Sequence, residues 1–356
     1  MNSSLCFFST LFTCLISDIT LADCKLGDGA VNQTFNIGAQ HVPRDAPVGS
    51  VIGTAEMSFV YTYTNALLCT NNDTLEVRGS NWAIILGINV PLFQTNILKA
   101  PVVKTNIPGV GMIVSVEEPM PENRSIESGI PPYPPYKLIA RLDWGKINYI
   151  RRVEFKFTLV KTDNNIPSGA SEIVTNSPAT YIQSGAQRSI GVFLAGTVIR
   201  SECSVAGGHA NINVPMGDVM RRNFKGKYSH LESKDFTIPL TNCVAGRYPT
   251  GQEWNYYQNS SAHIKFEGVQ GSSIIEASKG ILGLTQESTA KGVAVQVLRK
   301  DGITPLPIGQ EVSVASLSGS NMNIELKARY IQISDSLLGP EPGKADARAA
   351  FTVTYK

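Results

Sequence analysis

The last eight residues of the chain, 349–356, read AAFTVTYK. In this stretch Phe351, Val353 and Tyr355 alternate with threonines and the final lysine. Successive side chains of a β-strand point to opposite faces, so the alternation predicts a strand with one apolar and one polar face. Residues 193–205 (FLAGTVIRSECSV) and 236–243 (FTIPLTNC) are two further β-type runs, each with a cysteine at or near its end.

The rest of the chain repeats this character. Short runs rich in Val, Ile, Thr and Tyr are separated by Gly, Pro, Asn and Ser, and almost no stretch has helical apolar spacing. The chain of 356 residues has 42% hydrophobic residues, which is enough for more than one core, and its length favours two domains. We therefore predict an all-β protein of two domains.

The charge balance argues against nucleic acid as a partner. Lys and Arg total 31 against 29 for Asp and Glu, a net charge of +2, and no basic block occurs. Binding to a phosphate backbone depends on clustered cations. No nucleic-acid partner is expected.

The first half contains strand-like runs at residues 50–63, 82–90, 111–116, 137–142, 152–160 and 179–182. Polar segments at 70–81 and 161–171 are expected as loops, with a hairpin turn at the Asp-Asn-Asn run that begins at Asp163. A small, polar stretch (SGAQRSI) around 184–190 predicts a short linker at 188–192. The expected domains are residues 23–187 and 193–356.

The N-terminus resembles an export signal. Residues 5–21 read LCFFSTLFTCLISDITL and are followed by small residues that suit cleavage after Ala22. A membrane span needs about 20 apolar residues. This run is shorter and is interrupted by Asp18. We expect residues 1–22 to be a signal peptide and the protein to be exported.

Four cysteines remain after such cleavage, two in each expected domain. Local pairing predicts the disulfides Cys24–Cys69 and Cys203–Cys243, in keeping with an oxidising compartment. A zinc site is not expected, since there is no CxxC motif and no histidine has ligand spacing to a cysteine. No metal or cofactor is predicted.

The second half contains a series of short motifs in a fixed order over residues 193–356. These are GTVIRSEC (196–203), VPMGDV (214–219), FTIPLTNC (236–243), HIKFEG (263–268), KGVAVQVLRKDG (291–302), ARYI (328–331) and a terminal strand with a penultimate tyrosine, Tyr355. In these motifs and in their order the second half resembles the pilin domain of chaperone–usher fimbriae.

Because a complete disulfide-containing β region precedes this half, the chain resembles the two-domain tip adhesins of such fimbriae. The resemblance implies two immunoglobulin-like or jelly-roll sandwiches, of which the pilin domain lacks its last strand. A periplasmic chaperone and then the next fimbrial subunit would fill the resulting groove by strand addition. Phe351, Val353 and Tyr355 would form the edge of that groove. Transit through the periplasm and the outer-membrane usher to the fimbrial tip follows from the same resemblance.

In such adhesins the N-terminal domain binds a receptor. Sugars are held by an aromatic face together with amide, carboxylate or guanidinium groups. Three segments supply this mixture, at residues 78–82, at Asp143–Trp144 and at the run with Tyr133 and Tyr136. The candidate ligand-binding residues are Arg78, Asn81, Trp82, Asp143 and Trp144. Each tryptophan is alternatively a core residue of the sandwich. The Tyr133, Tyr136 and Asp163 loops are the next candidates.

Three functions remain open from the sequence. The leading one is adhesion to a host glycan or glycoprotein, the second is binding to an extracellular-matrix protein, and the third is a structural tip subunit without a receptor. An enzyme is not expected, because GxSxG, HExxH and phosphate-loop motifs are absent and residues 23–187 contain a single histidine, His41.

Overall fold

In the computed structural model, the described segments are residues 31–60, 102–118, 152–174, 180–184, 187–250 and 256–356, together with seven short strands outside these ranges. Side chains are described for 32–56, 102–114, 155–174, 191–250 and 256–356. Among these residues the regular structure is β, apart from one 3₁₀ turn at Arg221–Asn223. The expectation of an all-β protein is confirmed.

The strands of the first half form two main sheets. One has the order β3 (Val51–Val60), β12 (Arg152–Lys161), β8 (Val110–Glu118), β7 (Val102–Lys104) and β6 (Ile84–Ile85). The other contains β2 (Val31–Pro43), β13 (Gly169–Ile173), β14 (Thr180–Ser184), β5 (Thr74–Gly79), β10 (Leu138–Arg141) and β9 (Ser125–Ile126), together with most of β15 (Gln187–Val205). A small third sheet consists of β1 (Cys24–Leu26), β4 (Leu67–Cys69) and β11 (Asn148–Ile150).

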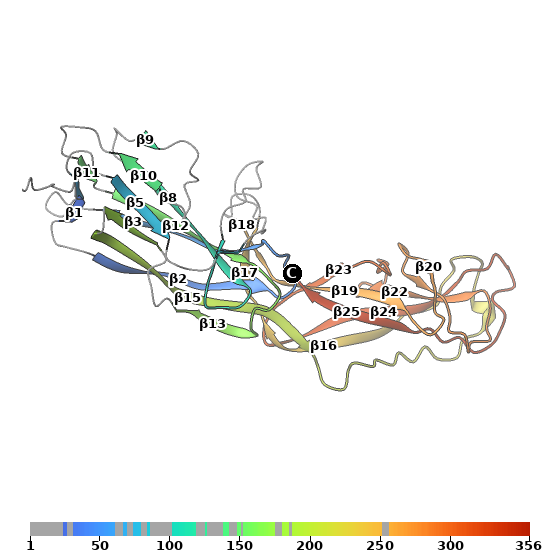
Figure 1. Ribbon diagram of the computed structural model, residues 1–356. Coiled ribbons are helices and arrows are strands. Elements are labelled where there is room, and N and C mark those ends of the chain that lie inside the picture. The colour runs from blue at the N-terminus through green and yellow to red at the C-terminus, as the bar shows by residue number, and fades with distance from the viewer. Residues whose placement is uncertain are drawn as a thin grey trace, which may run out of the picture.

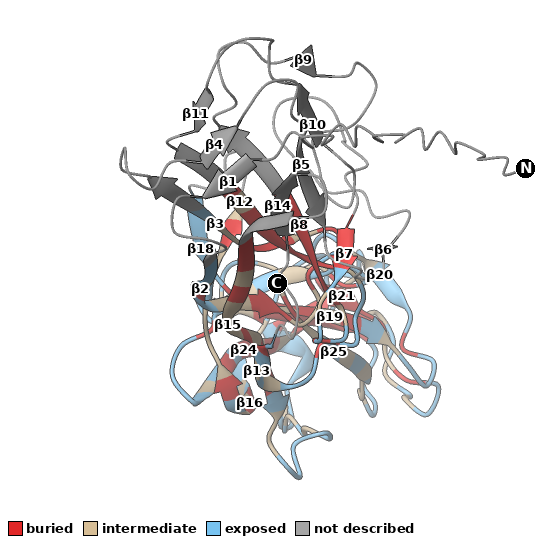
Figure 2. Ribbon diagram, turned by 60° about the vertical axis from the view of Figure 1, so that its left-hand side comes forward, coloured by how far each residue is buried: buried red, intermediate tan, exposed pale blue. Residues whose placement is uncertain are grey.

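The two main sheets face each other across a buried core. Phe35 of β2 stacks on Phe157 of β12 with ring centroids 6.1 Å apart. Phe155 and Leu159, on the same face of β12 as Phe157, are also fully buried. Burial of such aromatic and aliphatic surface is the main source of stability for a sandwich of this kind. Figure 2 shows this buried interior.

The second half is a second pair of sheets. One follows the order β20 (Ile274–Glu276), β21 (Ile281–Leu282), β22 (Val293–Arg299), β24 (Asn321–Gln332) and β16 (Lys234–Val244), and ends at the last residues of β15. The other consists of β23 (Val312–Ser316), β19 (Ser261–Gly268) and β25 (Ala349–Tyr355). Both contribute to one core, for example through Ile238 of β16 and Ile264 of β19. A hairpin of β17 (Arg247–Thr250) and β18 (Tyr256–Asn259) lies between the halves.

The residues of the predicted linker, 188–192, lie within the 19-residue strand β15. Ile190 pairs with Ile182 of β14 on one side and with Val31 of β2 on the other. Small and polar residues are compatible with a strand when both neighbours satisfy their backbone groups. The same strand then pairs with β16 from Glu202 onward, so the two halves share it (Figure 1).

Two of the expected loops are also corrected. Residues 74–79 of the polar segment 70–81 form β5, and residues 169–171 of the segment 161–171 belong to β13. Asp163 accepts a hydrogen bond from the Asn165 N–H at 2.5 Å, so it does form a local turn. The turn does not close a hairpin, since β12 and β13 belong to different sheets.

Candidate functional site

The last strand, β25, has one paired edge. It runs antiparallel to β19, with Tyr355 opposite Ala262 and Phe351 opposite Phe266. Among the described residues no second strand pairs with its other edge. The N–H and C=O of Tyr355 face that other edge, where they bond to Asp45 at 2.8 and 3.0 Å. Backbone groups alternate along an antiparallel strand, so Phe351 and Val353 present theirs on the same side.

A groove of about 530 Å³ lies along this edge, between β25 and the end of β15. Its apolar part is contributed by Val205, Phe351 and Val353, which pack against the core of the second half while remaining partly accessible. The other lining residues are Arg44, Ser168, Arg200, Glu202, Cys203, Ser204 and Tyr355. An unpaired strand edge beside apolar side chains is the arrangement that accepts an added strand.

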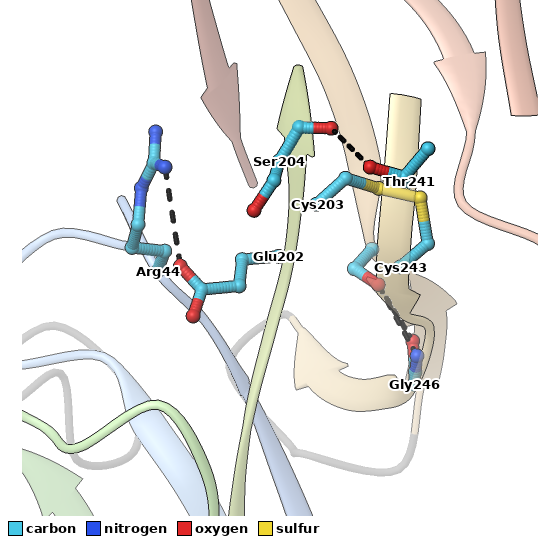
Figure 3. Close-up of a disulfide and its surroundings, with 8 residues drawn as sticks. Arg44, Glu202, Cys203, Ser204, Thr241, Cys243 and Gly246 are labelled. Carbon is cyan, nitrogen blue, oxygen red and sulfur yellow. Dashed lines mark hydrogen bonds and ion pairs between the residues drawn. A yellow bond between two sulfur atoms is a disulfide. The ribbon is translucent and has the colours of Figure 1, made fainter. Parts of the chain in front are cut away.

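The disulfide Cys203–Cys243 is present and confirms the sequence-based pairing. Both cysteines are buried, and the bond connects the end of β15 to β16 directly behind the groove (Figure 3). Beside it, Ser204 pairs with Thr241 across the same two strands. The cross-link therefore fixes one wall of the groove.

Charged residues gather where the groove meets the first half. Arg44 lies 3.9 Å from Glu202 (Figure 3). It also pairs with Asp45 at 2.9 Å, and its guanidinium is 4.6 Å from the centre of the Tyr355 ring. Lys161, only 1% exposed, donates a hydrogen bond from Nζ to the Arg44 carbonyl at 2.6 Å.

Burial changes the protonation behaviour of this junction. Desolvation lowers the pKa of Lys161, while the nearby Asp45 carboxylate opposes part of that effect. Burial raises the pKa of Tyr355, which keeps its hydroxyl neutral. His41, whose Nδ1 is 3.5 Å from the Ser201 hydroxyl, also has a pKa lowered by burial. Burial therefore disfavours the charged forms of Lys161, Tyr355 and His41 at this junction.

The side chains of the predicted ligand-binding residues lie outside the part of the chain that the structure describes. Arg78 lies in β5, where its backbone pairs with Tyr181, but its side chain is outside the described residues. Asn81, Trp82, Asp143 and Trp144 also lie outside them. Their role stays a prediction.

The other predicted disulfide is tested only at the level of the backbone. Cys24 of β1 and Cys69 of β4 are directly opposite each other in the antiparallel register. Their side chains lie outside the described residues, so the bond itself stays a prediction.

Sequence reasoning missed Arg44, Asp45 and Glu202. Arg44 and Asp45 follow β2 in a proline-flanked turn, and nothing local links them to a strand about 310 residues later. Glu202 lies in the motif GTVIRSEC, but the sequence analysis assigned a role only to the cysteine of that motif.

Within the described residues, no cluster of three metal-binding side chains occurs and no helix is long and apolar enough to cross a membrane.

Residues 192–356 match the family model described as "Fimbrial protein". This part of the chain is similar to that family, and we refer to residues 192–356 as the fimbrial domain. The match confirms the resemblance drawn from the motifs in residues 193–356. Over the whole chain, a fimbria adhesin protein of Klebsiella pneumoniae is 24% identical across 348 residues, covering 94% of each chain.

Solved structures include similar chains. The CupB6 tip adhesin from Pseudomonas aeruginosa is 17% identical, with 94% of each chain covered and a TM-score of 0.37. The receptor-binding domain of the adhesin MrkD1P of Klebsiella pneumoniae is 21% identical, covers 52% of this chain and 99% of its own, and has a TM-score of 0.36.

Proposed function

We propose that this protein is a tip adhesin of chaperone–usher fimbriae that binds a host-surface carbohydrate and does not catalyse a reaction on it. The adhesin of Klebsiella pneumoniae, similar over 94% of both chains, supports adhesion as the role. In this proposal residues 23–187 carry the receptor site and the fimbrial domain, residues 192–356, anchors the chain in the fibre. The chain is exported through the periplasm and displayed at the bacterial surface.

The observation that carries the assembly half of the proposal is the edge of β25 that no described strand pairs with, beside a groove with an apolar part. A periplasmic chaperone covers the edge first, and the N-terminal extension of the next subunit then replaces it as the donor strand. Strand addition supplies backbone hydrogen bonds to Phe351 and Val353 and apolar side chains to the groove. It also removes an edge that would otherwise promote aggregation.

Assembly is tested by comparing Val353→Asp with Thr352→Asp during co-expression with the chaperone of the same fimbrial system. Val353 lines the groove, whereas Thr352 is exposed and faces the opposite side of the strand. An aspartate at 353 places a charge against the inserted strand, so we expect loss of chaperone co-purification for Val353→Asp alone. Equal co-purification of both variants would contradict strand addition at this edge.

The receptor half is tested on a glycan array with the mature chain and five single alanine variants at Arg78, Asn81, Trp82, Asp143 and Trp144. Wild-type binding to a defined glycan supports the proposal, and loss in at least one variant with an unchanged melting temperature assigns the site. Binding to an extracellular-matrix protein and to no glycan would favour the second function. If none of the five variants loses binding, the site lies elsewhere, and the Tyr133 and Asp163 loops are examined next.

A further inference from the structure

The edge of β25 that no described strand pairs with is partly occupied by hydrogen bonds from elsewhere in the chain. At the C-terminal end of β25, these hydrogen bonds come from the turn that follows β2. The Asp45 N–H donates to the Tyr355 carbonyl at 3.0 Å, and the Asp45 carboxylate accepts the Tyr355 N–H at 2.8 Å. Arg44 donates from Nη2 to the Val353 carbonyl at 3.0 Å. Three backbone groups that an added strand needs are therefore occupied by the first half of the same chain.

This turn is anchored from behind, so it is not a loose loop that happens to touch the strand. The Arg44 N–H donates to the Ser201 carbonyl on β15 at 3.0 Å. The Arg44 carbonyl accepts from the buried Nζ of Lys161, at the end of β12. The N–H of Lys161 in turn donates to the Ser50 carbonyl at 2.9 Å. Both sheets of the first half hold the turn in place.

The direction of a donor strand follows from the same geometry. The C-terminal end of β25 lies beside the first half, whereas its other end points away from it (Figure 1). The groove along β25 is accordingly lined by Arg44 and Ser168 of the first half. The body of a subunit that donates its N-terminal extension must remain outside, at the Ala349 end. The extension therefore enters with its N-terminus leading and runs antiparallel to β25.

We propose that the Arg44–Asp45 turn is a stop that sets the register of the donor strand, an inference that rests on the proposed strand addition. A donor pairs with the edge from Ala349 to the N–H of Val353, five residues or about 17 Å of strand, and ends at the Arg44 guanidinium, which keeps its hydrogen bond to the Val353 carbonyl. Pairing with Tyr355 would require the donor to displace Asp45 and to break the Arg44 contacts with Val353 and Glu202. The receptor-bearing half thus selects how much of a donor segment the fimbrial domain accepts.

The test uses the mature full-length chain and two synthetic peptides of alternating valine and threonine, five and seven residues long, each acetylated and followed by the same lysine tail. Binding is measured for the wild type and for the double variant Arg44→Ala, Asp45→Ala. Asp235→Ala is the matched control, because Asp235 pairs with Lys327 in the other sheet of the fimbrial domain. Amide hydrogen exchange at Tyr355 is followed in parallel, also in the single variant Asp45→Ala.

For the wild type and the control we expect the two peptides to bind within twofold of each other. In the double variant the seven-residue peptide should bind at least fivefold more tightly than the five-residue peptide, because it gains at least one further backbone hydrogen bond. The Tyr355 amide should be protected in the wild type without peptide and should exchange faster in Asp45→Ala. The same length dependence in the wild type and the double variant overturns the stop. Failure of both peptides to bind any variant instead contradicts strand addition at this groove.

Discussion

Replacing Cys203 and Cys243 together by alanine removes the covalent connection behind the groove. The two residues are separated by 40 positions, and the chain-entropy relation for a loop of that length gives about 4 kcal/mol of stabilisation at 25 °C. The cysteines are 4% and 8% exposed, so alanine, which adds no polar atom to the interior, is the appropriate replacement. We expect the fimbrial domain to lose about 4 kcal/mol of unfolding free energy.

The assay is urea unfolding of the oxidised wild type and of the double alanine variant at the same pH. The midpoint should fall strongly while the slope changes little, unless the denatured state becomes less compact without the cross-link. A loss below about 1.5 kcal/mol would refute the reasoning, since it would mean that the constraint on the unfolded chain contributes little here.

Three further predictions concern other parts of the chain. Burial lowers the pKa of His41, so below about pH 6.5 the unfolded state binds more protons than the folded state and the protein should lose stability on acidification. In His41→Gln the melting temperature should therefore fall less between pH 7 and pH 5 than in the wild type. An identical fall in both proteins would contradict this. A Cβ at Gly268 would lie 1.8 Å from the Ser272 carbonyl oxygen, so Gly268→Ala should lower the unfolding free energy by about 1–3 kcal/mol. A Cβ at Gly207 would have no such neighbour within 4 Å, so Gly207→Ala should change the unfolding free energy by no more than about 0.5 kcal/mol. Similar melting curves for the two variants would be inconsistent with this packing. Non-reducing peptide mapping should recover Cys24 joined to Cys69, and a peptide joining either of them to the fimbrial domain would rule out the local pairing.

Local sequence patterns correctly predicted the strands whose own residues indicate both the extended conformation and the buried face. The run at 152–160 became β12, and the terminal alternation became β25 with Tyr355 1% exposed and Thr352 on the solvent side. The Cys203–Cys243 pairing could be predicted because each half contains two cysteines. In these cases one short segment carries both the strand propensity and the face that is buried.

Elements that depend on partners distant in the sequence were missed. β2 is a strand of 13 residues, but it contains polar residues such as Asn32, Gln33 and Asn36 and therefore has no recognisable strand pattern. Its parallel pairing with β15, and not its composition, stabilises it. The junction is a stronger case. The contact between Asp45 and Tyr355 joins residues 310 positions apart and exists only because β15 continues from one half into the other. No local signal encodes such a contact.

Amide hydrogen exchange along β25 tests the central claim most directly, in the isolated mature chain and in assembled fimbriae. Phe351 and Val353 present N–H groups to the free edge, so both should exchange rapidly in the isolated chain and become strongly protected after assembly. Thr352, whose N–H faces β19 in the antiparallel ladder, should be protected in both states. Equal protection of Phe351 and Val353 before and after assembly would contradict the account, because no strand would then have been added at this edge.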